Sequence, residues 1–230
     1  MSGVVSELAT NFHQSFPEIS VEVSGFGTQS GLEALRAGEA NLSLASWLPG
    51  DLDPQWRPAR LARDGIAVVV HADNPVRGLG MLQLQDLFRG RTDDWRSLGG
   101  LTTGDPVQPV TRELGSGTRQ AFESIVMGDQ AMTPRTVVAP SSHAVLDYVA
   151  AHRGAIGYLS MSELAPGVKV LQIEGVMPSP DSVADGTYAL TRELWFVYRD
   201  PASQSLQAFL DFVRSPAGQL IIGQRFSPIR

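Results

Sequence analysis

The sequence predicts an α/β fold in which helices flank mostly parallel sheets. Strand-like and helix-like segments alternate along the chain, and turn-rich stretches separate them. With 230 residues, 43% of them hydrophobic, the chain can build one large domain or two modest ones. Two turn-rich breaks, Asp73-Asn74-Pro75 and 178–186, are the expected crossings between two lobes. We therefore expect lobe one to comprise 1–73 and 187–230, and lobe two to comprise 74–186.

The N-terminal third is expected to begin with a helix, because apolar residues recur at helical spacing from Val5 to Phe16 and Pro17 then ends the element. Residues 19–23 alternate between apolar and polar as in a strand. The glycine-rich turn 24–31 leads into a helix through 32–35 that ends at Gly38. Apolar runs then predict strands at 42–45 and 66–70.

Helices and strands keep alternating over the rest of the chain. Helical spacing of apolar residues predicts helices at 83–88, 118–126, 144–151, 205–214 and 216–224. Short apolar runs predict strands at 107–110, 136–138, 155–159, 168–173 and 194–198. Because each helix follows a strand, neighbouring strands are expected to run parallel.

Composition excludes several classes of function. The net charge is −6 and basic residues form no long run, so we expect no nucleic-acid partner. Cysteine is absent and the four histidines lack metal-ligand spacing, so we expect neither thiolate chemistry nor a metal site. No apolar stretch reaches membrane-spanning length, and the N-terminus lacks the regions of a signal peptide. We therefore expect no direct membrane insertion and no signal peptide in this chain.

Residues 111–118 combine residue types that suit anion binding, between a predicted strand and a predicted helix. Glycines let the backbone approach a ligand, and the N–H groups at a helix start point outward with the positive end of the helix dipole behind them. Ser116 and Thr118 add hydroxyl donors, and Arg112 supplies a charged fork for two oxygens. The alternative is that a hydroxyl only caps the helix and Arg112 lies on a solvated face.

A second glycine and hydroxyl turn, residues 27–31, also opens a predicted helix. Two helix starts from different parts of the chain are thus candidates to bind one anion. The alternative for Thr28 and Ser30 is again helix capping.

These residues carry a resemblance to a known family. The stretch Arg112-Glu113-Leu114-Gly115-Ser116-Gly117-Thr118 is similar to the Arg-x-x-Gly-Ser-Gly-Thr phosphate loop of the phosphate-binding proteins of bacterial ABC phosphate transporters, which are type II periplasmic binding proteins. The resemblance covers nearly the whole chain, with further matching segments at 38–46, 63–70, 84–100, 154–158 and 209–219.

The resemblance implies which residues bind the ligand in a cleft between two lobes. It assigns four residues of lobe two and three of lobe one: Arg112, Ser116, Gly117, Thr118, Thr28, Ser30 and Ser46. Ser2 stands where the family has a serine that contacts phosphate. Trp47 stands where the family commonly has a charged residue, and its indole donates but cannot accept a hydrogen bond. Glu113 or Asp64 would then accept the proton of hydrogen phosphate, and Trp47 is either a ligand contact or a packing residue.

The resemblance implies a substrate-binding protein, not an enzyme, that captures phosphate or a similar tetrahedral oxyanion for uptake by an ABC transporter. It implies an extracytoplasmic location, a transporter permease as partner and no cofactor. Three alternatives remain open: an oxyanion-sensing or scavenging module outside transport, an enzyme acting on phosphate esters, and a pair of lobes that binds nothing.

Overall fold

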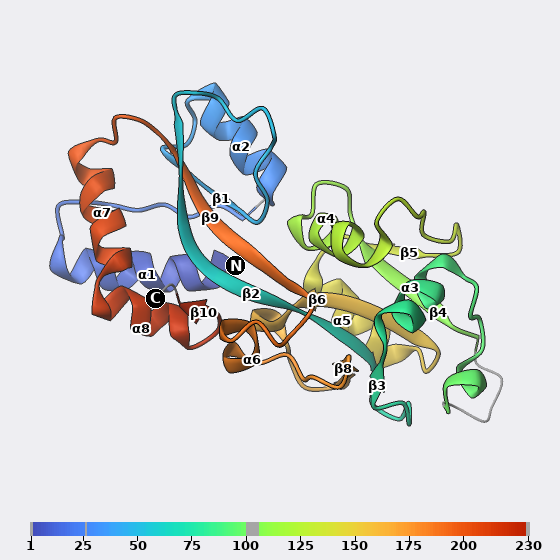
Figure 1. The fold of residues 1–230 in the computed structure, drawn as a ribbon. Helices are drawn as coiled ribbons and strands as arrows, with labels where there is room; N and C mark the ends of the chain where they lie inside the picture. Colours follow the sequence, from blue (N-terminus) through green and yellow to red (C-terminus); the bar gives the residue numbers. More distant parts are fainter. Residues whose placement is uncertain (1, 26, 100–105, 229–230) are drawn as a thin grey trace. The chain divides into compact units, whose positions relative to one another are not determined.

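The computed structural model describes residues 2–25, 27–99 and 106–228 (Figure 1). It divides into two compact units: unit 1 comprises Met1–Asp64 and Arg192–Arg230, and unit 2 comprises Gly65–Thr191. Unit 1 is therefore formed by two separate stretches of the chain. The chain passes from one unit to the other within strand β2 (Trp56–His71) and at the start of β9 (Thr191–Arg199). The sequence predicted these crossings at the turn-rich stretches 73–75 and 178–186.

Unit 1 is built on a sheet that pairs strands from both ends of the chain. Strand β1 (Leu42–Ala45) is antiparallel to β9, β9 neighbours β2, and β10 (Ser227–Pro228) is antiparallel to β2. The expectation of mostly parallel strands is therefore wrong for unit 1. The α/β alternation predicts parallel neighbours only for strands joined by one helical connection, and β1 and β9 belong to separate passages of the chain through the unit.

The helices of unit 1 cover two apolar clusters. Helices α1 (Ser2–Ser15), α7 (Gln204–Arg214) and α8 (Pro216–Gly223) pack around buried residues that include Leu8, Phe12 and Phe209. Helix α2 (Thr28–Ala37) lies apart from these three, against β1, and buries Leu32 and Leu35 beside Trp56 (Figure 1).

The predicted strand at 19–23 is wrong, because this segment pairs with no strand among the described residues. Its alternation is nevertheless real. Ile19, Val21 and Val23 are half-buried against the cluster formed by α1, α7 and α8, and the residues between them are exposed. An extended segment that packs on helices thus has the same apolar period as a strand.

Unit 2 contains a mixed sheet in the order β2, β6 (Ala155–Ser160), β4 (Gln108–Arg112) and β5 (Val137–Ala139). Strand β4 is parallel to β5 and to β6, as expected, whereas β2 is antiparallel to β6 and to β7 (Val168–Val170). The expected strand 168–173 is divided, since β8 (Gln172–Ile173) leaves β7 to pair in parallel with β3 (Gly78–Leu79).

The helices of unit 2 lie where helical spacing predicted them, with additions. They are α3 (Met81–Arg89), α4 (Gly117–Phe122), α5 (Ser142–Ala151), the short α6 (Pro180–Ala184), the π-helix η2 (Glu123–Met127) that continues α4, and the 3-10 helices η1 (Trp95–Leu98) and η3 (Met161–Glu163). No helix in the described part of the chain has both the length and the apolar character needed to cross a membrane.

Candidate functional site

The anion loop, residues 112–118, joins the end of β4 to the start of α4. Gly115 has φ 85°, a left-handed conformation that glycine adopts without strain. Ser116 is the N-cap of α4, and its hydroxyl accepts a hydrogen bond from the backbone N–H of Arg119 at 3.4 Å. Ser116 and Thr118 are both buried. Ser116 therefore caps α4, and this bond leaves its hydroxyl hydrogen available to a ligand, so a role in ligand binding stays a prediction.

The loop lies where three parallel strands end. Strand β4 is flanked by β5 and β6, and the chain runs from β4 through α4 to β5, then through α5 to β6 on the other side of β4. Because the three strands run parallel, their carboxyl ends and the connections that follow them lie at the same edge of the sheet. Arg112 ends β4, Ser142 follows β5 and Glu163 follows β6, so side chains from three connections meet at this edge.

Arg112 is held by a hydrogen-bond network and is only 12% exposed. Its Nε and Nη2 donate to the two carboxylate oxygens of Glu113 at 2.9 and 2.8 Å. Its Nη1 donates to Ser142 Oγ at 2.6 Å, and Ser142 Oγ donates to Glu163 Oε2 at 2.7 Å. Arg112 therefore does not lie on a solvated face, and that alternative is wrong.

A second arginine fixes the base of the anion loop. Arg119 Nη1 donates to the backbone carbonyl of Arg112 at 2.9 Å, and its Nε pairs with Glu123 at 2.8 Å. Beneath them, Tyr158 stacks on Phe122 with ring centroids 3.8 Å apart. Its burial raises the pKa of the Tyr158 hydroxyl to about 12, while the bond to Thr111 opposes this shift. The aromatic side chains that pack behind the anion loop are thus buried and in close contact.

In unit 1, Thr28 and Ser46 form a buried hydroxyl pair. Thr28 is the first residue of α2, and its Oγ1 lies 3.1 Å from Ser46 Oγ and accepts from Ser46 N at 3.1 Å. The N-cap of α2 is Gly27, which has no side-chain capping bond, so the capping interpretation of Thr28 is wrong. Ser30, two residues further on, is exposed.

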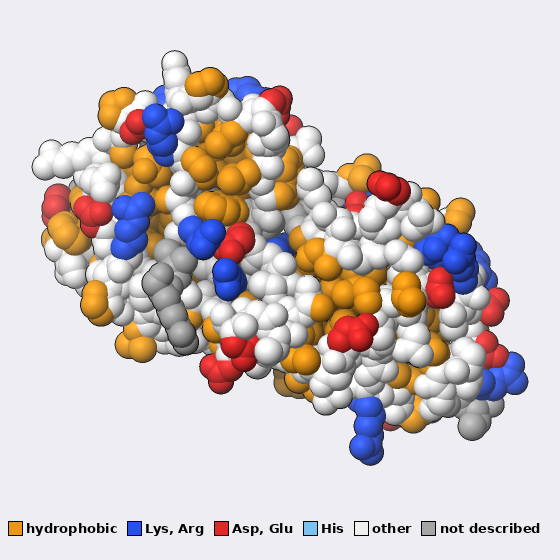
Figure 2. All heavy atoms as spheres, in the orientation of Figure 1, with side chains coloured by type: hydrophobic (Ala, Val, Ile, Leu, Met, Phe, Trp, Pro, Cys, Tyr) orange, Lys and Arg blue, Asp and Glu red, His pale blue; other side chains and the backbone are white. Residues whose placement is uncertain are grey.

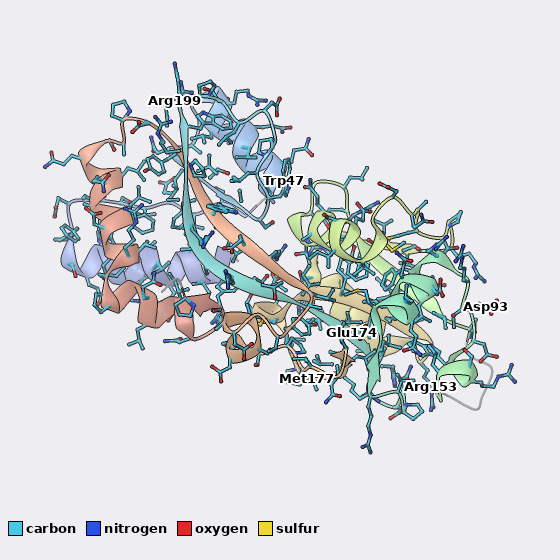
Figure 3. All side chains as sticks on the ribbon, viewed as in Figure 1. Trp47, Asp93, Arg153, Glu174, Met177 and Arg199 are labelled. Carbon is cyan, nitrogen blue, oxygen red and sulfur yellow. The ribbon has the colours of Figure 1, made fainter. Side chains whose placement is uncertain are left out.

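Trp47 follows this pair directly and is half-buried beside α2 (Figure 3). Its indole Nε1 is buried and has no hydrogen-bond partner within the described part of the chain. A buried N–H without a partner is costly, so its presence favours a ligand or water as the missing acceptor. Its packing against the cluster of Leu32 and Leu35 agrees equally with the packing interpretation.

Two further predicted residues are placed by the structure. Ser2 is the first residue of α1, and its contact with a ligand stays a prediction. Asp64 is fully buried, and its Oδ2 accepts from Arg192 Nε and Nη2 at 3.0 and 2.7 Å. Glu113, by contrast, belongs to the anion loop itself, with its side chain 37% exposed. Of the two acids suggested as proton acceptors, Glu113 is thus the one next to the site.

Charged side chains of both signs lie on the surface. Figure 2 shows basic side chains scattered over this face, several of them beside acidic side chains. Exposed arginines pair with aspartates, as in Arg57–Asp200 and Arg96–Asp94. Across the described residues, no group of three or more histidines and acids is arranged to hold a metal ion.

Ser142 and Glu163 were not among the site residues predicted from the sequence. Neither belongs to a glycine-rich turn or to a charged run, and they lie 21 residues apart. Both lie in the segment that follows a strand parallel to β4: Ser142 comes after β5, and Glu163 comes after β6. Strand order, which the sequence did not provide, was needed to recognise this.

Known proteins resemble this chain over its full length. A family model described as a PBP superfamily domain matches residues 1–217. The phosphate-binding protein PstS of Bacillus subtilis (strain 168) is 27% identical over 236 residues, covering 100% of this chain and 78% of that protein. A phosphate ABC transporter substrate-binding protein from Clostridium perfringens, solved with bound phosphate, has a TM-score of 0.94 and 30% identity and covers 100% of this chain and 96% of its own. An ABC-type phosphate transport receptor from Vibrio cholerae has a TM-score of 0.83 and 28% identity, with coverage of 100% and 96%.

Proposed function

Because the chain belongs to the family described as the PBP superfamily domain, we propose that it is a substrate-binding protein for inorganic phosphate or a similar tetrahedral oxyanion. The proposal rests on the burial and the hydrogen bonds of Arg112 at the carboxyl edge of β4. The side chain is mostly buried and oriented by Glu113 and Ser142, yet these bonds use only three of the N–H groups of a guanidinium. One N–H on each terminal nitrogen is left for ligand oxygens.

The anion loop supplies the other donors. The backbone N–H groups of Gly117 and Thr118 stand at the start of α4, and the hydroxyls of Ser116 and Thr118 are buried beside them. Such fixed dipoles replace the hydration shell of an anion without reorganising, and charged hydrogen bonds from arginine add roughly twice the strength of neutral ones. Arg112, Ser116, Gly117 and Thr118 are accordingly the proposed ligands from unit 2.

Unit 1 contributes a second set of ligands in this proposal. Thr28 and Ser46 are buried hydroxyls that bond to each other, and each keeps further hydrogen-bonding capacity. Trp47 is a proposed donor because its indole N–H lacks a partner among the described residues. Ser30 and Ser2 are weaker proposals, since Ser30 is exposed and Ser2 rests on the sequence resemblance alone.

We further propose that the protein works without catalysis, outside the cytoplasm, and passes its ligand to the permease of an ABC transporter. This part rests on the named functions of the relatives in Bacillus subtilis, Clostridium perfringens and Vibrio cholerae. In this proposal Arg112 and the loop hydroxyls hold the ligand reversibly, through hydrogen bonds and charge alone.

Isothermal titration calorimetry with phosphate, sulfate, arsenate and molybdate tests the proposal. Saturable phosphate binding with a stoichiometry of one ion per chain is expected, together with a higher melting temperature in phosphate, because a ligand that binds only the folded state stabilises it. Neither heat nor thermal shift at millimolar phosphate would contradict the proposed function.

A further inference from the structure

The orientation of Arg112 depends on contacts from two sides. Glu113, its neighbour in sequence, takes the Nε and Nη2 edge of the guanidinium. Ser142, which lies 30 residues further along the chain, takes Nη1 at 2.6 Å. Glu113 binds two nitrogens at once, but its side chain is 37% exposed and belongs to the next residue of the same loop, so this pair alone does not fix the guanidinium relative to the rest of the sheet. The second contact, from another connection of the sheet, does.

Ser142 is itself held by Glu163. The Ser142 hydroxyl accepts from Arg112 and donates its single hydrogen to Glu163 Oε2 at 2.7 Å. Since a serine hydroxyl carries one hydrogen, Ser142 has none left to donate to an anion. Ser142 is 6% exposed, and this burial favours a single orientation of its hydroxyl group. Ser142 is therefore better suited to orient Arg112 than to donate a hydrogen bond to the anion.

The hydroxyl of Ser142 is not needed to start helix α5. Ser141 is the N-cap of α5, and its Oγ accepts from the N–H of Ala144 at 3.1 Å. Side chains that cap helices stabilise them, but this helix already has its cap in Ser141. The contact of Ser142 with Arg112 thus has no evident role in the local helix.

We propose that Ser142 and Glu163 are positioning residues that aim the terminal N–H groups of Arg112 at the bound oxyanion. The proposal deepens the proposed phosphate-binding function and rests on it. In this arrangement Glu163 fixes the Ser142 hydroxyl, and Ser142 in turn fixes Nη1 of Arg112. Loss of either residue leaves the charge of Arg112 in place but allows its guanidinium to reorient.

A double-mutant cycle measured by phosphate titration tests the proposal on the full chain. Ser142→Ala is expected to weaken phosphate binding about tenfold, the range expected for losing one hydrogen bond to a charged group. In an Arg112→Ala background the same change should have an effect of less than about twofold, because residues that act through one another are not additive. Ser97→Ala, at an exposed position of η1 in the same unit, is the matched control and should leave affinity unchanged.

Two variants of Glu163 test the same positioning role without changing Ser142. Glu163→Gln retains an oxygen that accepts from Ser142, and we expect it to bind phosphate within about threefold of the wild type, whereas Glu163→Ala should match Ser142→Ala. Equal losses in the presence and absence of Arg112 would overturn the positioning role, since they would indicate a direct ligand or a general structural effect. A wild-type chain that binds no phosphate would instead overturn the proposed function, and the positioning role with it.

Discussion

The close approach of α2 to β1 provides the sharpest test of how the fold supports the Thr28 and Ser46 pair. Gly31 lies in α2 opposite Ser43 of β1. A Cβ atom at Gly31 would stand 2.6 Å from Ser43 Oγ but 3.7 Å from Ser43 Cβ. The first distance is a clash and the second is an ordinary contact. Gly31→Ala therefore conflicts with a single atom, the Ser43 hydroxyl oxygen.

The size and sign of the effect follow from two opposing terms. Overpacking a tight contact costs roughly 1–3 kcal/mol, whereas alanine is favoured over glycine inside a helix by about 1 kcal/mol. Gly31→Ala alone should therefore lower the free energy of unfolding by about 1 kcal/mol. In a Ser43→Ala background the clash is gone and only the helix term remains, so the same change should raise the free energy of unfolding by about 1 kcal/mol.

Ser43→Ala is a suitable background because the Ser43 hydroxyl is buried and has no hydrogen-bond partner in the part of the chain that is described. Its removal leaves no partner unsatisfied. Denaturant unfolding of the wild type, both single variants and the double variant gives the coupling directly. Because Thr28 begins α2, Gly31→Ala should also weaken phosphate binding, and Ser43→Ala should restore it. Equal destabilisation by Gly31→Ala in both backgrounds would show that the Ser43 hydroxyl is not the atom that the added methyl group meets.

Three further predictions concern single side chains. Arg112→Ala should weaken phosphate binding by about 2 kcal/mol or more, measured by calorimetry, and unchanged affinity would remove Arg112 from the site. Trp47→Phe removes a buried N–H without a partner, so the protein should be at least as stable by thermal unfolding but bind phosphate more weakly; unchanged affinity would leave Trp47 a packing role. Tyr158 has a pKa raised from 10.0 to about 12 in the folded chain, so the unfolded state loses this proton first as pH rises. The free energy of unfolding should therefore fall by about 2 to 3 kcal/mol between pH 10 and 12, and Tyr158→Phe should lack that part of the fall in denaturant titrations at each pH.

Helices were the most predictable part of the fold. Each predicted helix is present, because the apolar spacing that the sequence shows is the face that packs: Leu32 and Leu35 of α2 are buried, and Gly38 ends that helix with φ 75°. Local chemistry suffices for such an element.

Strand pairing was less predictable, because it joins residues far apart in the chain. Residues 19–23 alternate like a strand, but they pack on helices and pair with no described strand. The antiparallel pair of β1 and β9 aligns Leu42 with Tyr198, which no local pattern indicates. Strand β2 begins at Trp56, well before its continuous apolar run from Ile66.

In the candidate site, too, the residues of one local segment were predictable and those from distant segments were not. Arg112, Ser116 and Thr118 were predicted because a single glycine-rich segment contains them all. Ser142 and Glu163 were missed because their relation to Arg112 depends on β5 and β6 flanking β4. Residues that orient a ligand-binding group leave little signal in sequence when they come from separate connections of a sheet.

Calorimetric titration with phosphate of the wild-type chain and of Arg112→Ala tests whether Arg112 binds the anion. We expect saturable binding of one phosphate ion per wild-type chain and a loss of about 2 kcal/mol or more of binding free energy in the variant. Equal phosphate affinity in the two proteins, or no phosphate binding by the wild type, would contradict this expectation.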